Sequence, residues 1–232
     1  MPKARHPRRG SMQFWPRKRS GHSLVRVRSW ADENNVKPLG FIGYKAGMTY
    51  VLAADNRAKS LTKGEKIQLA STIIECPPML VVGVSFYKFS KKLSSVLHDK
   101  LPKELAKKIQ VPKKTVKKFD EVKDYDDLRL LVISQPKLAA TGTKKPKLLE
   151  IALGGDTEGK TAYAKDILGK EIAINDVLEG VSAVDIRGVT KGKGFQGTVK
   201  RYGVPIRQHK SEKTKRGIGN LGAWTPKRVD YR

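Results

Sequence analysis

Two glycine motifs in this sequence have residue types and a spacing that could bind phosphate groups. The first spans residues 154–161 (GGDTEGKT), which satisfies the phosphate-loop pattern G-x-x-x-x-G-K-[ST] between a strand-like and a helix-like run. Such a loop turns backbone N–H groups toward phosphate, and Asp156 and Glu158 would place negative charges beside the same phosphates. A nucleotide-binding fold also needs parallel strands joined by crossover helices, and too few residues follow for these. We therefore predict an acidic loop that caps a helix, and keep a phosphate-loop NTPase at 154–161 as an alternative.

The second motif spans residues 192–197 (GKGFQG), which matches the dinucleotide-binding pattern G-x-G-x-x-G. A dinucleotide site requires a helix to begin there, and Gly203 and Pro205 follow so closely that residues 198–202 are expected to be a poor helix. Lys191 and Lys193 suit a nucleic-acid backbone better than a single cofactor. Glycines would let the main chain lie against RNA where a Cβ would clash. An RNA-binding loop and a glycine-rich hairpin both fit this motif.

The arginines are concentrated near the two ends of the chain. Of fifteen arginines, seven lie in Met1–Trp30 and six in Ile186–Arg232, while the residues between hold only Arg57 and Arg129. The planar guanidinium suits phosphates and base edges, whereas lysine also serves as a general solubilising charge. The last 47 residues carry thirteen Lys/Arg against two acids, with eight glycines, and cannot bury enough apolar surface to fold by themselves. We predict a folded core with two arms that bind nucleic acid.

The composition argues against several other classes of protein. A net charge of +26 predicts dense phosphate contact or adsorption to an acidic membrane, but no apolar run is long enough to span a bilayer and no basic amphipathic helix appears. A single cysteine, Cys76, excludes a disulfide framework and fits a small buried residue in a reducing, intracellular compartment. The four histidines are scattered without ligand spacing, so we expect no metal site and no catalytic residue: His6, His22, His98 and His209.

The pattern of apolar residues predicts an α+β fold, mainly β, with an antiparallel β-barrel core. Strands are expected in residues 39–54, 66–76, 79–89, 129–135, 148–153 and 181–189, and a helix in 162–168. Residues 91–127 hold eleven lysines and no arginine, and are expected to be a solvated, partly helical insertion. We divide the chain into a basic arm (1–30), the first part of the core (31–90), the insertion (91–127), the remainder of the core (128–187) and a Gly/Arg/Lys-rich extension (188–232).

Five segments taken together resemble the ribosomal protein L3 family of the large subunit, in its archaeal and eukaryotic type. They occur in the order that the family has: residues 13–19 (QFWPRKR), 41–49 (FIGYKAGMT), 127–136 (DLRLLVISQP), 188–197 (GVTKGKGFQG) and 222–226 (GAWTP). The fourth, followed by VKRYG at 199–203, is the most specific of them.

The resemblance implies a structural protein of the cytoplasmic ribosome that binds large-subunit ribosomal RNA, acts early in assembly and is not an enzyme. It also implies neighbouring ribosomal proteins as partners, no small-molecule substrate, and no cofactor except Mg²⁺ held by the RNA. In the family, the loop after the GKGFQG block reaches toward the peptidyl transferase centre with a tryptophan near its tip, which corresponds to Trp224 here. A nucleic-acid-binding protein outside the ribosome remains a second alternative.

Arginine and lysine for phosphates and aromatic rings for base stacking define the expected RNA contacts. These are Arg5, Arg8, Arg9, Phe14, Trp15, Arg17, Lys18, Arg19, Arg26, Arg28, Lys45, Lys191, Lys193, Phe195, Gln196, Lys200, Arg201, Arg207, His209, Lys210, Lys213, Lys215, Arg216, Trp224, Lys227 and Arg228. Close approach of the backbone is expected at Gly188, Gly192, Gly194, Gly197, Gly217 and Gly222.

Two features depart from the family pattern. Family members continue well past the position of Arg232 with basic and barrel-completing sequence, so this chain resembles a C-terminally truncated copy. Some eukaryotic relatives carry a histidine where Lys215 stands, so no chemistry specific to that histidine is expected here.

Overall fold

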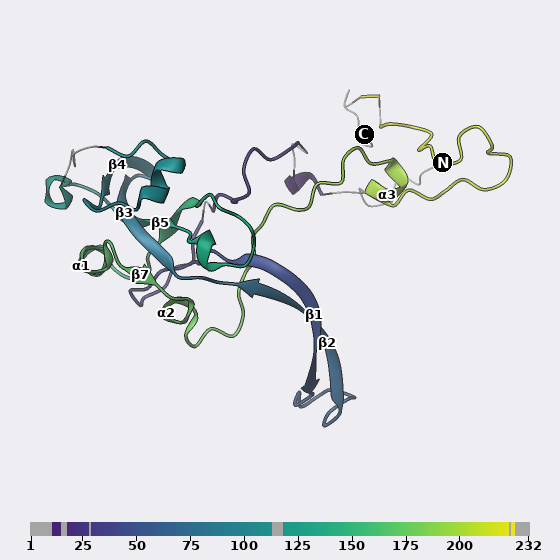
Figure 1. Cartoon of the computed structure of the whole chain (residues 1–232). Coiled ribbons are helices and arrows are strands. Elements are labelled where there is room, and N and C mark those ends of the chain that lie inside the picture. The colour runs from purple at the N-terminus through teal and green to yellow at the C-terminus, as the bar shows by residue number, and fades with distance from the viewer. Residues whose placement is uncertain (1–10, 15–17, 28, 113–117, 223, 226–232) are drawn as a thin grey trace. The chain divides into compact units, whose positions relative to one another are not determined.

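The computed structural model describes residues 11–14, 18–27, 29–112, 118–222 and 224–225. The chain divides into two compact units, one made of Met1–Val25 with Arg187–Arg232 and the other of Arg26–Ile186. The first unit contains the 3-10 helix η1 (Met12–Phe14) and the short helix α3 (Thr198–Tyr202). Every strand of the described residues lies in the second unit (Figure 1). The fold is therefore mainly β with some helices.

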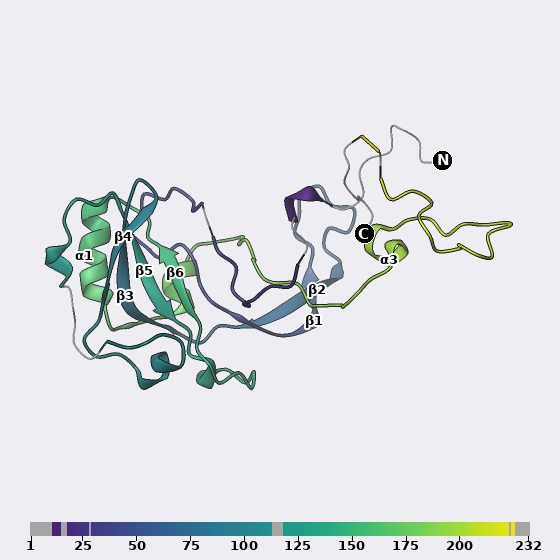
Figure 2. The ribbon, with the colours of Figure 1, turned by 90° about the horizontal axis from the view of Figure 1, so that it is seen from above.

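The second unit is built around a five-stranded antiparallel sheet. Its order is β4 (Lys91–Leu97), β3 (Met79–Lys88), β5 (Asp127–Ile133) and β6 (Leu148–Ala152) (Figure 2). The short β7 (Glu171–Ile172) pairs with the start of β3. The central strands β3 and β5 are rich in Val, Ile and Leu and are buried along most of their length, as expected for strands covered on both faces.

One face of this sheet forms the main hydrophobic core together with helices α1 (Thr157–Ile167) and α2 (Ile174–Leu178). Phe86 is fully buried there, and its ring meets Phe119 and Tyr125 edge-on, with centroids 5.2 and 4.9 Å away. Phe119 comes from η3 (Phe119–Glu121), so the segment predicted as a solvated insertion contributes an aromatic ring to the core. Burial of such side chains stabilises the fold by about 1.5–3 kcal/mol each.

The opposite face of the sheet is apolar at one end and polar at the other. At the apolar end Leu105 of η2 (Lys103–Lys107) packs on Val82 and Leu131. At the polar end the Glu150 carboxylate accepts hydrogen bonds from Ser85, Tyr87 and Lys92. Burial and the hydrogen bond to Glu150 raise the pKa of Tyr87 to about 12. Burial acts to raise the pKa of Glu150 too, but the hydrogen bonds outweigh it and the net shift is downward.

Strands β1 (Tyr44–Ala54) and β2 (Lys66–Glu75) form a separate, curved two-stranded ribbon (Figure 1). The register places Val51 beside Leu69 on one face, while Tyr50 and Leu52 point to the other, and each of these side chains is exposed. The sequence predicted core strands here, so their exposure differs from the expectation. Because the ribbon and the five-stranded sheet are not joined in the described residues, the predicted barrel is not confirmed.

Several predicted elements differ from the structure. Residues 181–189 contain no strand, and residues 198–202, expected to be a poor helix, form α3, which Gly203 ends with φ +63°. Helix α1 begins at Thr157, five residues before the predicted start, and a further 3-10 helix, η4, covers Pro136–Leu138. The 91–127 segment contributes strand β4 to the sheet besides its two short 3-10 helices. Cys76 is half-buried, and burial raises the pKa of its thiol.

Candidate nucleic-acid interface

The C-terminal extension is built from irregular backbone, one short helix and one organised turn. Residues 181–197 have no regular secondary structure, and α3 follows directly. Glycine at 188, 192, 194 and 197 and proline at 205 explain why longer elements do not form. Neither hydrophobic cluster of the described residues includes a side chain of the extension. Its side chains are therefore carried by a largely irregular main chain.

Arg207 organises the turn at residues 207–217. Its backbone N–H donates to the carbonyl of Lys215 at 3.0 Å, its Nη1 donates to Oγ1 of Thr214 at 3.0 Å, and its carbonyl accepts from Oγ of Ser211 at 3.1 Å. An ideal Cβ at position 219 would lie 2.3 Å from Nη2 of Arg207, so glycine there leaves room for the guanidinium. Arg207, predicted as an RNA contact, is thus half-buried and engaged within the chain.

The other basic residues predicted in this extension are mostly presented to solvent. Exposed positions are Lys191, Lys193, Lys200, His209, Lys210, Lys213, Lys215 and Arg216, whereas Arg201 is half-buried with its guanidinium 5.2 Å from the centre of the Tyr202 ring. None of the lysines in that set forms an ion pair with an acid in the described part of the chain. Gln196 donates to the carbonyl of Lys193 at 3.2 Å and so supports the local loop.

Two aromatic side chains of the extension stand in solvent. Phe195 is 101% exposed and Trp224 is 90% exposed. Large apolar rings without protein contacts are the residue types that stack on nucleic-acid bases.

The glycines of the GVTKGKGFQG segment have open space around them. No described residue has an atom within 4 Å of an ideal Cβ at Gly188, Gly192, Gly194 or Gly197, and of these four only Gly194, with φ +68°, has a backbone that disfavours a side chain. The protein's own packing therefore requires no glycine at 188, 192 or 197. At Gly217 the atom nearest to an ideal Cβ is the carbonyl oxygen of Thr214, at the ordinary contact distance of 3.5 Å. The backbone φ of Gly222 is 152°.

The N-terminal arm is described only in part. Lys18, Arg19 and Arg26 are exposed, the backbone of Phe14 lies in η1, and Lys45 is exposed on β1. The remaining predicted contacts lie outside the described residues: Arg5, Arg8, Arg9, Trp15, Arg17, Arg28, Lys227 and Arg228.

Groups of the phosphate-loop motif that would bind phosphate are bound instead to other residues of the protein. The N–H groups of Gly154 and Gly155 donate to the carbonyls of Lys37 and Glu33 at 2.9 and 2.7 Å, so they are not free for a phosphate. The ammonium of Lys160 is held 2.9 Å from the Asp127 carboxylate, and the strand before the motif, β6, is antiparallel to its neighbour. Asp156 occupies the N-cap position of α1 but makes no capping hydrogen bond through its side chain. This local geometry opposes nucleotide binding.

The two arginines of the central segment are both engaged inside the second unit. The guanidinium of Arg57 binds Asp55, and that of Arg129 stacks 4.2 Å from the centre of the Tyr87 ring.

In the described part of the chain, no helix has the length and apolar character needed to cross a bilayer. The same residues contain no group of three or more His, Cys, Asp or Glu side chains that could hold a metal ion.

Comparison with known proteins gives one consistent result. A sequence model described as ribosomal protein L3 matches residues 1–232. The chain is 43% identical to the large ribosomal subunit protein uL3 of Methanocaldococcus jannaschii over 236 residues, which cover 96% of this chain and 70% of that protein. It is 40% identical to uL3 of Methanosphaera stadtmanae (99% and 72% covered) and 40% identical to uL3 of Nanoarchaeum equitans (96% and 70% covered).

Proposed function

Since the chain belongs to the ribosomal protein L3 family, we propose that it binds large-subunit ribosomal RNA through its two basic arms. It is a structural protein of the large subunit of the cytoplasmic ribosome and is not an enzyme. We also propose that it contacts the RNA directly, has other ribosomal proteins as neighbours and joins the subunit early in assembly.

The observation that carries the proposal is the exposed composition of residues 187–225. Eight lysines and arginines there are exposed, two aromatic rings lie in solvent, and neither hydrophobic cluster of the described residues includes a side chain of this segment. Each phosphate that a lysine or arginine neutralises releases counterions, which gives affinity without a preformed pocket. Exposed rings add base stacking of roughly 1–3 kcal/mol per base. Cations, rings and glycines in one segment fit RNA better than they fit a protein partner.

The open glycines support the same partner. Because neither packing nor backbone conformation requires glycine at 188, 192 and 197, the missing side chains have a use outside the chain. A main chain without Cβ atoms can lie directly against a sugar-phosphate backbone. We assign these positions to close approach by RNA.

Finer features of the proposal come from the family. Trp224 would lie near the peptidyl transferase centre, the protein would join the subunit early, and neighbouring ribosomal proteins and RNA-held Mg²⁺ would complete its surroundings. The antiparallel barrel is also part of the proposal, since the apolar, uncovered faces of the β1–β2 ribbon are the surfaces that a closed barrel would bury. A two-stranded ribbon is marginally stable by itself in water, which favours such cover.

Salt-dependent binding tests the proposal. The full chain is titrated with a large-subunit RNA transcript at several salt concentrations, beside the variant Lys191→Ala/Lys193→Ala and a control, Lys144→Ala/Lys145→Ala. All four lysines are exposed, so the two variants remove equal charge. Each lost phosphate contact reduces the log–log slope by roughly 0.7–0.9. We expect a reduction of about 1.4–1.8 in the first variant and little change in the control; equal slopes in both would contradict the proposed interface.

A further inference from the structure

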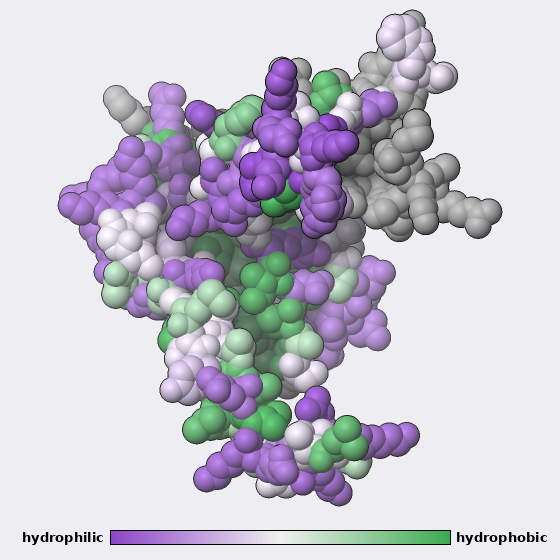
Figure 3. All heavy atoms as spheres, turned by 90° about the vertical axis from the view of Figure 1, so that its right-hand side faces the viewer, coloured by the Kyte–Doolittle hydropathy of each residue, from purple (hydrophilic) through white to green (hydrophobic). Residues whose placement is uncertain are grey.

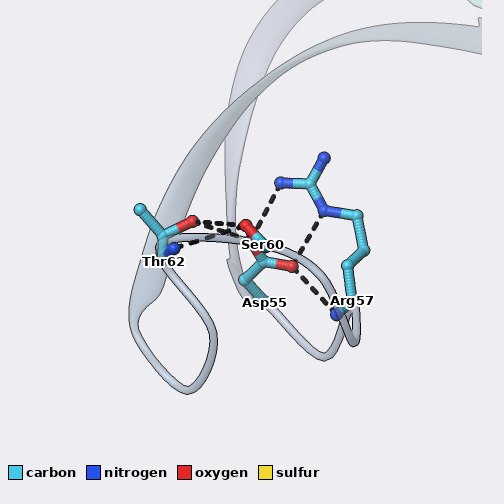
Figure 4. Close-up of polar contacts among 4 residues, drawn as sticks. All are labelled: Asp55, Arg57, Ser60 and Thr62. Carbon is cyan, nitrogen blue, oxygen red and sulfur yellow. Dashed lines mark hydrogen bonds and ion pairs between the residues drawn. The ribbon is translucent and has the colours of Figure 1, made fainter.

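The turn between β1 and β2 is organised around a buried carboxylate. We call residues 55–65 the hairpin-tip loop. The side chain of Asp55 is 1% exposed and accepts hydrogen bonds from the backbone N–H, Nε and Nη2 of Arg57 at 3.1, 2.9 and 2.8 Å (Figure 4). It also accepts from Oγ of Ser60 at 2.6 Å and Oγ1 of Thr62 at 2.7 Å. All five bonds come from within the loop.

Backbone hydrogen bonds close the same loop. Asp55 N–H donates to the carbonyl of Glu65 at 3.0 Å, and Gly64 N–H donates to the carbonyl of Asp55 at 2.9 Å. The hydrogen bond from Arg57, followed by those from Ser60 and Thr62, holds the pKa of Asp55 well below its usual range. Neither hydrophobic cluster of the described residues includes a side chain of this loop. The contacts that organise this loop are therefore polar.

The loop presents cations and one large apolar side chain to solvent. Lys59 and Lys63 are exposed, Lys66 follows at the start of β2, and the side chain of Arg57 is 73% exposed although it binds Asp55. Leu61 is 105% exposed. Arg57 neutralises Asp55, which leaves Glu65 as the one unmatched acid against three lysines. Hydrophilic residues accordingly gather at the lower end of the surface in Figure 3, below the apolar residues of the ribbon.

We propose that the hairpin-tip loop is an RNA-binding site separate from the two arms, with Lys59 and Lys63 on phosphates and Leu61 against a sugar or base face. This inference rests on the proposed function, because it assumes that the chain binds ribosomal RNA. A protein partner fits less well, since the loop offers a single large apolar side chain among cations. A loop already ordered in the free protein loses less conformational entropy on binding, which raises affinity.

The first test removes the two lysines. The full-length variant Lys59→Ala/Lys63→Ala is compared with Lys144→Ala/Lys145→Ala for binding to the large-subunit RNA transcript. We expect the salt slope to fall by about 1.4–1.8 in the tip variant and to stay unchanged in the control. If wild-type protein does not bind the RNA, the proposed function fails. If wild-type protein binds and the tip variant has the wild-type slope, only the tip site is wrong.

The second test separates organisation of the loop from its charge. Asp55→Asn and Glu65→Gln each remove one negative charge from the loop, but only Asp55 holds the hydrogen-bond network. If the ordered loop binds RNA, Asp55→Asn weakens binding by about three- to tenfold despite the more positive charge. Glu65→Gln should leave the affinity equal or slightly higher. Tighter binding in both variants would overturn the requirement for an ordered loop, and the lysine variant tests the site even if Asp55→Asn misfolds.

The third test identifies the partner directly. A photo-crosslinking residue in place of Leu61, Leu61→p-benzoylphenylalanine, is carried by the full chain into reconstituted large subunits. We expect adducts with ribosomal RNA. Adducts with a ribosomal protein alone would overturn the proposal and assign the loop to a protein contact.

Discussion

Alanine at the open glycines separates contact with RNA from contact within the protein. We predict that Gly188→Ala, Gly192→Ala and Gly197→Ala change the free energy of unfolding by less than about 1 kcal/mol, because no atom lies within 4 Å of the new Cβ and no positive φ is strained. If RNA lies against this backbone, each methyl group instead creates an overpacked contact that costs about 1–3 kcal/mol, or roughly five- to 150-fold in Kd.

The assay combines thermal unfolding with RNA titration at several salt concentrations. The number of cations is unchanged, so the affinity should fall while the salt slope stays constant, unlike the lysine variants. Gly47→Ala, another open position, serves as a control for RNA binding. Gly83→Ala serves as the control for stability, since its Cβ would lie 2.4 Å from the carbonyl oxygen of Val96 and should destabilise the β3–β4 pairing. Wild-type affinity in all three arm variants would refute close approach.

Three further predictions follow from individual side chains. Trp224→Ala should leave the unfolding transition unchanged, because the ring is 90% exposed, but alter transfer-RNA accommodation or sensitivity to antibiotics at the catalytic centre; ribosomes identical to wild type in both assays would contradict its assignment. Lys160→Ala removes the ion pair with Asp127 and should lower the free energy of unfolding by about 1 kcal/mol or less. Equilibrium dialysis should detect no ATP or GTP binding before or after this change. The free energy of unfolding should fall as pH rises from about 10 toward 12, because the pKa of Tyr87 is raised from 10.0 to about 12 in the folded state and stability from a raised pKa is lost through that window; denaturation of Tyr87→Phe should lack this part of the decline.

The strands of the five-stranded sheet could be predicted where an apolar segment is bounded by residues that interrupt a strand, such as proline. Residues 79–88 are almost entirely apolar and follow Pro77-Pro78, which cannot sit in a central ladder, so β3 was predicted within one residue of its end. β4 was missed because Lys91 and Lys92 make it resemble a solvated segment, as is common for edge strands. β1 and β2 were predicted as core strands because an apolar pattern does not reveal which face is covered.

The charge pattern predicted which basic side chains of the extension are exposed better than it predicted the role of each arginine. Arg207, predicted as an RNA contact, has a second role that the charge pattern does not reveal, because it hydrogen-bonds Thr214 and Lys215 within a turn. Asp55, Arg57, Ser60 and Thr62 carry no recognisable motif, and only the folded turn brings them together. A run of Asp, Ser and Thr in a turn between two strands is the one signal that could have indicated such a network.

Sedimentation with large ribosomal subunits tests the central claim most directly. The full chain is incubated with large subunits lacking their own copy, washed in high salt and centrifuged through a gradient. We predict that it migrates with the subunit, and that neutral substitution of the exposed lysines and arginine at 191, 193, 200, 210, 213, 215 and 216 returns it to the top. Wild-type protein that stays at the top, or a neutralised variant that still migrates with the subunit, would contradict RNA binding through the extension.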